Sequence, residues 1–139
     1  MTAAEARERF ATARVARLAT VGAEGRPHLV PIVFALAGDT VYHAVDRKPK
    51  RTTALRRLAN VAANPRASLL VDVYDDADWT RLWWVRADGA GRVLEAGSDE
   101  ARSAVALLRR RYGQYRDAPP AGPVLAVDVE RWSGWRASG

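Results

Sequence analysis

The sequence predicts an α+β fold, in which a mostly antiparallel sheet of six to seven strands curls into a small barrel with flanking helices. Two observations lead to this class. Most of the expected strands are joined by hairpins or short turns, as at Ala37-Gly38-Asp39. Segments with helical periodicity occur only at the start, in the middle and near the end of the chain.

The first elements follow from caps and turns. Thr2 and Glu5 form a T-x-x-E capping box, which predicts a helix that ends near Ala13. A strand is expected over residues 15–21, and a third strand is expected over residues 40–46, after the hairpin turn.

The second strand is expected over residues 27–36. Its apolar residues point in both directions, so both faces are expected to be covered: Val30 and Ile32 on one face, Leu29 and Val33 on the other. Pro31 cannot donate a hydrogen bond to a neighbouring strand, which predicts an edge or a bulge there. Backbone groups near such a position can meet a ligand, although a plain edge strand explains the proline equally well.

The middle of the chain is expected to form a helix over residues 53–63 and a strand over residues 67–74. The buried stripe of this helix is expected at helical spacing: Leu55, Leu58, Ala59 and Ala62. Arg56 and Arg57 are then expected to point towards water, and Pro65 ends the helix.

The remaining elements are expected in this order: a strand over 82–97, or two strands broken at 88–91; a helix from Ser98 or Asp99 to Tyr112; a loop over 115–123; and a strand over 124–129. Trp83 and Trp84 are adjacent in the first of these strands, so their side chains point to opposite faces and are not expected to share a pocket wall. One is expected to pack in the barrel, and the other to face a ligand or a subunit partner, unless both are structural fillers.

A cluster of cations precedes the central helix. Arg47, Lys48, Lys50 and Arg51 follow the third strand, and Thr52 or Thr53 can cap the helix. Cations are unfavourable at a helix N-terminus, whose unpaired N–H groups attract anions. The pattern therefore indicates a phosphate site, with a solvated basic turn as the alternative.

Length and composition limit the possible classes of protein. The 139 residues are expected to form a single domain over 1–139. The hydrophobic content of 48% excludes a disordered chain, and the absence of cysteine excludes disulfides and thiolate metal sites. We expect a cytoplasmic protein without a signal peptide or membrane segment. The net charge of +6 favours an acidic partner, but no nucleic-acid-binding motif is recognised.

The residues that could carry chemistry are few. His28 and His43 are expected on neighbouring strands as a cross-strand pair or as surface residues, and no metal site is expected. There is no nucleophile elbow, phosphate loop or dinucleotide fingerprint. No catalytic residue is therefore named, and any catalysis is expected to belong to a bound cofactor.

Several stretches together resemble a known family: ARLATV at 16–21, PHLVPIVF at 27–34, DRKPKR at 46–51 and NPRASLLVDVYDDADWTRLWWVRADG at 64–89. The chain is similar to the pyridoxamine 5'-phosphate oxidase-like (PPOX class) enzymes, which bind FMN or coenzyme F420 on a split β-barrel. It most resembles a small actinobacterial branch of probable F420-dependent enzymes.

The resemblance implies a homodimer with the cofactor at the subunit interface. It also implies the cofactor-binding residues, which are Val30, Pro31, Ile32 and Val33 beside the ring, Asp46, Lys48, Lys50 and Arg51 around the phosphate, and Trp79 and Trp83. The implied reaction is hydride transfer between F420 and a small unsaturated organic substrate. FMN-dependent chemistry and cofactor binding without turnover remain the alternatives, and the sequence does not name the substrate.

Overall fold

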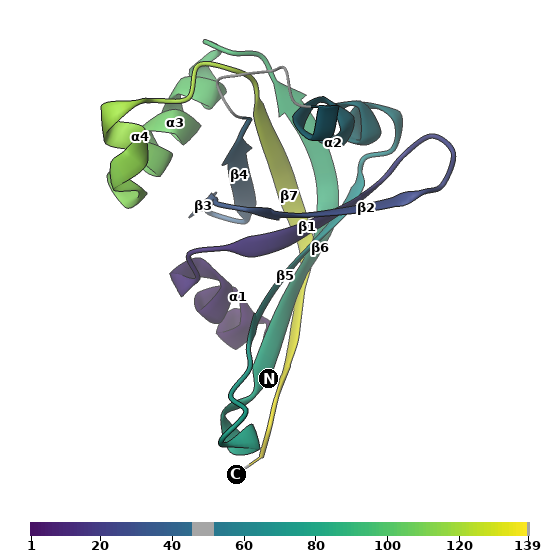
Figure 1. Ribbon diagram of the computed structural model, residues 1–139, viewed down its shortest axis with the longest axis vertical. Helices are drawn as coiled ribbons and strands as arrows, with labels where there is room; N and C mark the ends of the chain where they lie inside the picture. The colour runs from purple at the N-terminus through teal and green to yellow at the C-terminus, as the bar shows by residue number, and fades with distance from the viewer. Residues whose placement is uncertain (46–51, 139) are drawn as a thin grey trace.

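The computed structural model describes residues 1–45 and 52–138 (Figure 1). In chain order its elements are α1 (Ala3–Thr12), β1 (Ala16–Val21), β2 (Pro27–Ile32), β3 (Ala35–Ala37), β4 (Thr40–Ala44), α2 (Thr52–Ala63), β5 (Arg66–Val73), the short 3-10 helix η1 (Trp79–Arg81), β6 (Trp83–Leu94), α3 (Asp99–Arg111), α4 (Gly113–Asp117) and β7 (Val124–Arg136). Among the described residues, no helix is both long enough and apolar enough to span a membrane.

The strands form one seven-stranded sheet in the order β2-β1-β5-β6-β7-β4-β3. Every neighbouring pair is antiparallel. The long strands β6 and β7 run together through the molecule, while β1 and β2 cross the sheet at its middle (Figure 1). The expected α+β class and the split β-barrel are therefore confirmed.

Side chains alternate across the sheet and give it two unlike faces. The inner face is packed around α1, where the ring of Phe10 lies 4.7 Å from that of Phe34 and 5.2 Å from that of Trp132. The other face, here called the open face, carries Arg17, Leu70 and the residues directly opposite them on neighbouring strands. Leu70 is 37% exposed on this face.

Several local predictions are confirmed. The Thr2 hydroxyl accepts a hydrogen bond from the Glu5 amide and begins α1, and Ser98 caps α3 in the same way. Pro31 pairs with Arg17 in an unbroken register and β2 ends the sheet order, so of the two predicted alternatives the edge strand is the one found. Residues 83–94 form one strand, which carries an irregularity at Asp88/Gly89 against β7.

The expected strand over residues 27–36 is wrong in two respects. It breaks after Ile32, because side chains take up the backbone groups of the next two residues. The Tyr112 hydroxyl accepts from the Phe34 amide at 3.2 Å and donates to the Phe34 carbonyl at 3.0 Å. Both faces are not covered either, since Leu29 is 67% exposed on the open-face side.

The expected buried stripe of the central helix is wrong at two of its positions, whereas Leu58 is half-buried and the side chain of Leu55 lies outside what the structure describes. Ala59 and Ala62 are exposed, whereas Asn60 and Val61 are buried. The Asn60 amide donates to the Thr20 hydroxyl at 3.1 Å, and this polar contact turns the helix away from its most apolar stripe. The stripe was predicted from the spacing of apolar residues alone, which overlooks that an asparagine can be buried when its side chain is hydrogen-bonded.

Two further boundaries differ from expectation. The last strand continues to Arg136 rather than ending near residue 129, because it pairs with β6 along its whole length. The predicted loop over 115–123 begins with the short helix α4. The extension of β7 places Trp132 and Trp135 on opposite faces of the sheet.

Candidate functional site

His43 lies buried at the end of β4, with only 7% of its surface exposed. Its Nδ1 is 3.1 Å from the Val33 carbonyl oxygen, and its Nε2 contacts Nη1 of Arg57 from α2. A carbonyl oxygen can only accept and a guanidinium can only donate. The ring is therefore neutral, with its proton on Nδ1. Burial, and then the charge of Arg57, lowers the pKa of His43 to about 4.

Arg57 was expected to point towards water, and this expectation is wrong. Rather than pointing into water it is partly buried against His43, and its Nε has no hydrogen-bond partner in the part of the chain that the structure describes. Burial lowers the pKa of this guanidinium. Among the residues that the structure describes, no carboxylate forms an ion pair with it. A partly buried charge without a counter-charge is costly, so the position suits an anionic ligand.

His28 faces the same helix from β2. Its pKa is lowered by burial and by the charges of Arg57 and Arg56. Its Nδ1 is buried, and none of the described residues forms a hydrogen bond with it. The expected cross-strand pair with His43 is wrong, because β2 and β4 are not adjacent in the sheet. The charge of Arg57 instead acts on both histidines and contributes to lowering the pKa of each.

The residues expected beside the cofactor ring have different environments. Ile32 is buried in the core and Val30 packs against it, whereas Pro31 is exposed on the other face. Val33 is half-buried, and its carbonyl accepts from His43. A ligand at this edge would therefore meet Pro31, Val33 and backbone rather than the Ile32 side chain.

The expected phosphate-binding residues Asp46, Lys48, Lys50 and Arg51 lie outside the described residues. The helix that follows them begins at Thr52, as the sequence predicted to within one residue. Arg57 is one and a half turns into that helix, which brings a further cation to the same side of the sheet as His43.

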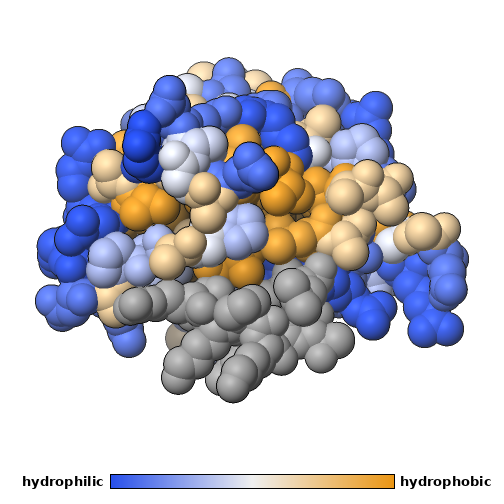
Figure 2. Space-filling view, turned by 90° about the horizontal axis from the view of Figure 1, so that it is seen from above, coloured by the Kyte–Doolittle hydropathy of each residue, from blue (hydrophilic) through white to orange (hydrophobic). Residues whose placement is uncertain are grey.

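These observations fit a ligand that carries an anionic group beside an apolar part. Arg57 Nε and His28 Nδ1 are buried polar atoms with no hydrogen-bond partner among the described residues. Figure 2, seen from the end of the molecule that carries α2 and α3, shows apolar residues gathered at the centre of the face and hydrophilic residues around them. An aromatic ring with an anionic tail needs both kinds of surface.

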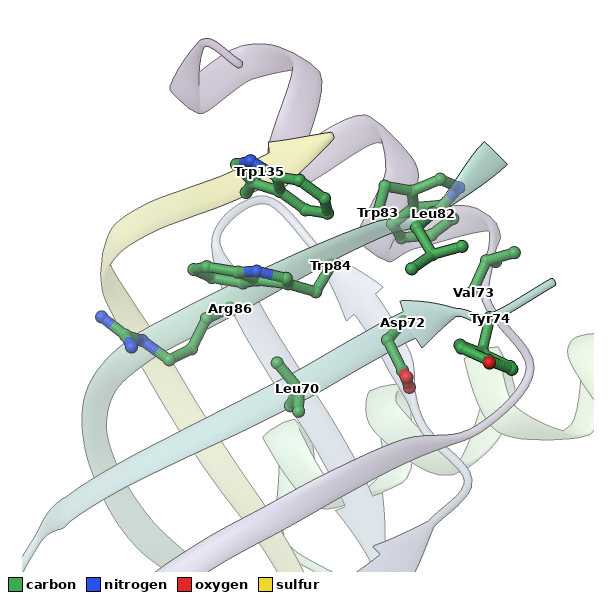
Figure 3. Close-up of a pocket in the computed structure, with 9 residues that line it drawn as sticks. All are labelled: Leu70, Asp72, Val73, Tyr74, Leu82, Trp83, Trp84, Arg86 and Trp135. Carbon is green, nitrogen blue, oxygen red and sulfur yellow. The ribbon is translucent and has the colours of Figure 1, made fainter. Parts of the chain in front are cut away.

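A second candidate region lies at the far end of the open face. A hollow of about 370 Å³ is lined by Leu70, Asp72, Val73, Tyr74, Leu82, Trp83, Trp84, Arg86 and Trp135 (Figure 3). Trp84 and Trp135 are directly opposite on β6 and β7, and the Arg86 guanidinium lies 5.9 Å from the ring centre of Trp84. Trp135 is 47% exposed.

The structure separates the tryptophans as expected, with one exception. Trp83 packs towards the inner face, where the Arg9 guanidinium lies 5.1 Å from its ring, and Trp84 points to the open face. Both nevertheless border the hollow, so the expectation that they share no pocket wall is wrong. Trp79 begins η1 and is 67% exposed. Trp135 was missed because the last strand was expected to end before it.

Comparison with known proteins gives one family match and one curated relative. The family model described as Pyridoxamine 5'-phosphate oxidase matches residues 2–136. The 5a,11a-dehydrotetracycline/5a,11a-dehydrooxytetracycline reductase of Streptomyces rimosus subsp. rimosus is 34% identical over 86 residues. That alignment covers 62% of this chain and 59% of the reductase, which is less than two thirds of its length.

Solved structures share the fold at low sequence identity. A heme binding protein from Mycobacterium smegmatis matches with a TM-score of 0.77 and 23% identity, over 100% of this chain and 56% of that protein. A FAD-binding protein from Mesorhizobium loti matches with a TM-score of 0.68 and 22% identity, over 99% of this chain and 96% of that protein. Different ligands are thus bound on the same scaffold.

Proposed function

Because the chain belongs to the pyridoxamine 5'-phosphate oxidase family, as its sequence resemblance predicted, we propose that it is an oxidoreductase that uses coenzyme F420. The reaction is hydride transfer between the deazaflavin and a small unsaturated organic substrate. The observation that carries the proposal is Arg57, a partly buried cation without a carboxylate partner in the described part of the chain.

The charge of the protein supports F420 over FMN. Both cofactors offer a phosphate for Arg57 and for the run of cations at 47–51. F420 adds an acidic polyglutamyl tail, which suits a chain of net charge +6 and the exposed Arg56 beside the site. FMN is the second candidate because a FAD-binding protein shares the fold.

The similarity to a reductase supports the direction of the reaction. The relative's name describes reduction of dehydrotetracyclines, which are unsaturated ring compounds. When bound, the coenzyme supplies the hydride chemistry. The protein's residues bind and orient: Arg57 holds the anionic end, and the edge strand at Pro31 and Val33 lies beside the ring.

The open face supports the proposal of a homodimer with the cofactor at the interface. Leu29, Leu70 and Trp135 expose apolar surface on this face of the sheet. Large exposed apolar residues on one face are typical of protein–protein contacts. We place the partner subunit there, with Trp84 and Trp135 at the contact and Trp79 and Trp83 near the partner's cofactor.

Titration of the purified protein tests the cofactor. Quenching of F420 fluorescence at micromolar protein, with weaker or no binding of FMN, supports the proposal. Tight FMN binding with a flavin spectrum favours the second candidate, and a heme Soret shift without flavin binding overturns both. Reduced F420 that is oxidised only when cyclic enones are added shows turnover, whereas binding without oxidation indicates a carrier protein.

A further inference from the structure

The imidazole of His43 joins the two parts of the proposed cofactor site. Its Nδ1–H donates to the Val33 carbonyl at the edge strand, and its Nε2 accepts from Nη1 of Arg57 on α2. Among the described residues, no hydrogen bond joins Val33 directly to Arg57. His43 is therefore the one described side chain that bonds to both.

The neutral state of His43 is essential to this arrangement. A protonated ring would present N–H at Nε2 to the N–H of Arg57, so that two donors and two positive charges would meet. Burial in the sheet prevents that protonation, since the neighbour directly across on β7 is the apolar Leu125. Among the described residues, Arg57 is the charged group that faces the ring. Burial lowers the pKa of Arg57, and Tyr115 on α4 acts on it in the opposite direction.

The orientation of Arg57 follows from this contact. One terminal nitrogen contacts His43, while Nε has no hydrogen-bond partner within residues 1–45 and 52–138. A flexible arginine would otherwise lose rotamer freedom when it binds an anion, and a preset geometry reduces that loss.

We propose that His43 is a positioning residue, whose neutral imidazole fixes the guanidinium of Arg57 against the edge strand so that it can bind the anionic group of the cofactor. The inference rests on the proposed function, but it concerns residues that the resemblance did not assign. His43 itself does not contact the cofactor.

Substitutions of His43 separate its two bonds. Counting bonds from Cβ, the terminal atoms of glutamine reach the position of Nε2, whereas those of asparagine reach only that of Nδ1. In F420 and FMN fluorescence titrations, H43F is expected to weaken binding about tenfold, since one positioned charge-assisted bond is lost. H43Q should stay within about threefold of wild type, and H43N should resemble H43F.

A double substitution distinguishes positioning from simple packing. H43F should change affinity by less than about twofold when Arg57 is already replaced by methionine, because nothing is left to position. An equal loss in both backgrounds would overturn the inference. The inference would also be overturned if H43F bound the coenzyme as tightly as wild type, or if H43Q bound it as weakly as H43F.

Nitrogen NMR of the imidazole gives a readout that needs no cofactor. The Nδ1–H tautomer should persist down to pH 5, and R57M should raise the pKa of His43 by about one unit, because a neighbouring positive charge is removed. A wild type that binds neither coenzyme would sink the proposed function. The inference would then be judged with inorganic phosphate, which should shift the His43 resonances of wild type but not of R57M; unmoved resonances would overturn it.

Discussion

The region around Arg57 and the open face of the sheet differ in what they bury and what they expose. Around Arg57 the polar groups are buried and the side chains are held by neighbours, as in the contact between His43 and the Val33 carbonyl. On the open face, Leu70 and Trp135 leave apolar surface in contact with solvent. The first region lacks a counter-charge, and the second lacks a covering surface. From this difference we propose that a small ligand completes the first region and that a partner subunit covers the second.

Protonation of His43 should have the largest effect, and it should act only on the region around Arg57, here called the closed region. The folded pKa of about 4 lies below the ordinary 6.5, so the unfolded chain binds the extra proton as pH falls between these values. The free energy of unfolding is therefore highest above pH 6.5 and falls as the pH is lowered towards 4. At 1.36 kcal/mol per pKa unit, the loss at pH 4 is about 3 kcal/mol.

Urea unfolding at pH 7 and pH 4 measures this loss. H43Q lacks the titrating group and serves as the control, because the contributions of carboxylates such as Glu100 and Asp128 cancel in the comparison. Equal pH dependence in wild type and H43Q would contradict a neutral buried His43.

Replacement of Arg57 by methionine should come next in size. The substitution keeps the packing stem but removes the charge, so coenzyme binding should weaken by about 2 kcal/mol, roughly thirtyfold. Fluorescence titration measures this change. R110M, at an exposed position of α3, is the matched control and should bind as wild type does. Similar losses in both variants would mean that only net charge matters.

A lysine at Leu70 should break the open face while leaving the closed region intact. Burying an unpaired charge at a subunit contact should raise the dimer dissociation constant at least tenfold, about 1.4 kcal/mol. Sedimentation analysis measures the association. A106K adds the same charge on the exposed surface of α3 and should leave it unchanged. A strictly monomeric wild type would end this part of the proposal.

The smallest effect is expected where neither region is involved. Arg92 makes two hydrogen bonds of 2.7 Å to Glu100, and the Tyr42 hydroxyl donates to the same carboxylate. The ion pair is about 40% exposed, so E100Q should cost only about 0.5–1 kcal/mol in thermal unfolding. Altered coenzyme affinity or dimerisation in E100Q would show that the two regions are not separable.

Most of the fold could be predicted from the sequence because it depends on local signals. The capping box at Thr2, the cap at Ser98 and the edge position of Pro31 each act within a few residues. The strand break at Phe34 depends instead on Tyr112, which is 78 residues away. The full length of β7 likewise depends on its pairing with β6, and no local pattern carries that information.

The candidate site was predicted less completely for the same reason. The cation cluster was visible as a run of charges, but Arg57 was assigned to solvent by the phase of the helix. That phase is set by Asn60, which is buried through its bond to Thr20. The asparagine in the middle of the expected helix was the signal that could have revealed the rotation, and with it the inward arginine.

Two glycines set how closely α2 approaches the sheet. A Cβ atom at Gly91 would lie 2.9 Å from Val61, and one at Gly22 would lie 3.0 Å from the Asn60 side chain. An added methyl group at either position would force Val61 or Asn60 to shift, and a shift that the helix shares would move Arg57 with it. The affinity for an anion could therefore be retuned from the sheet beneath the helix, by residues that never meet the ligand. Libraries aimed at new coenzyme preferences would do well to vary these two glycines first.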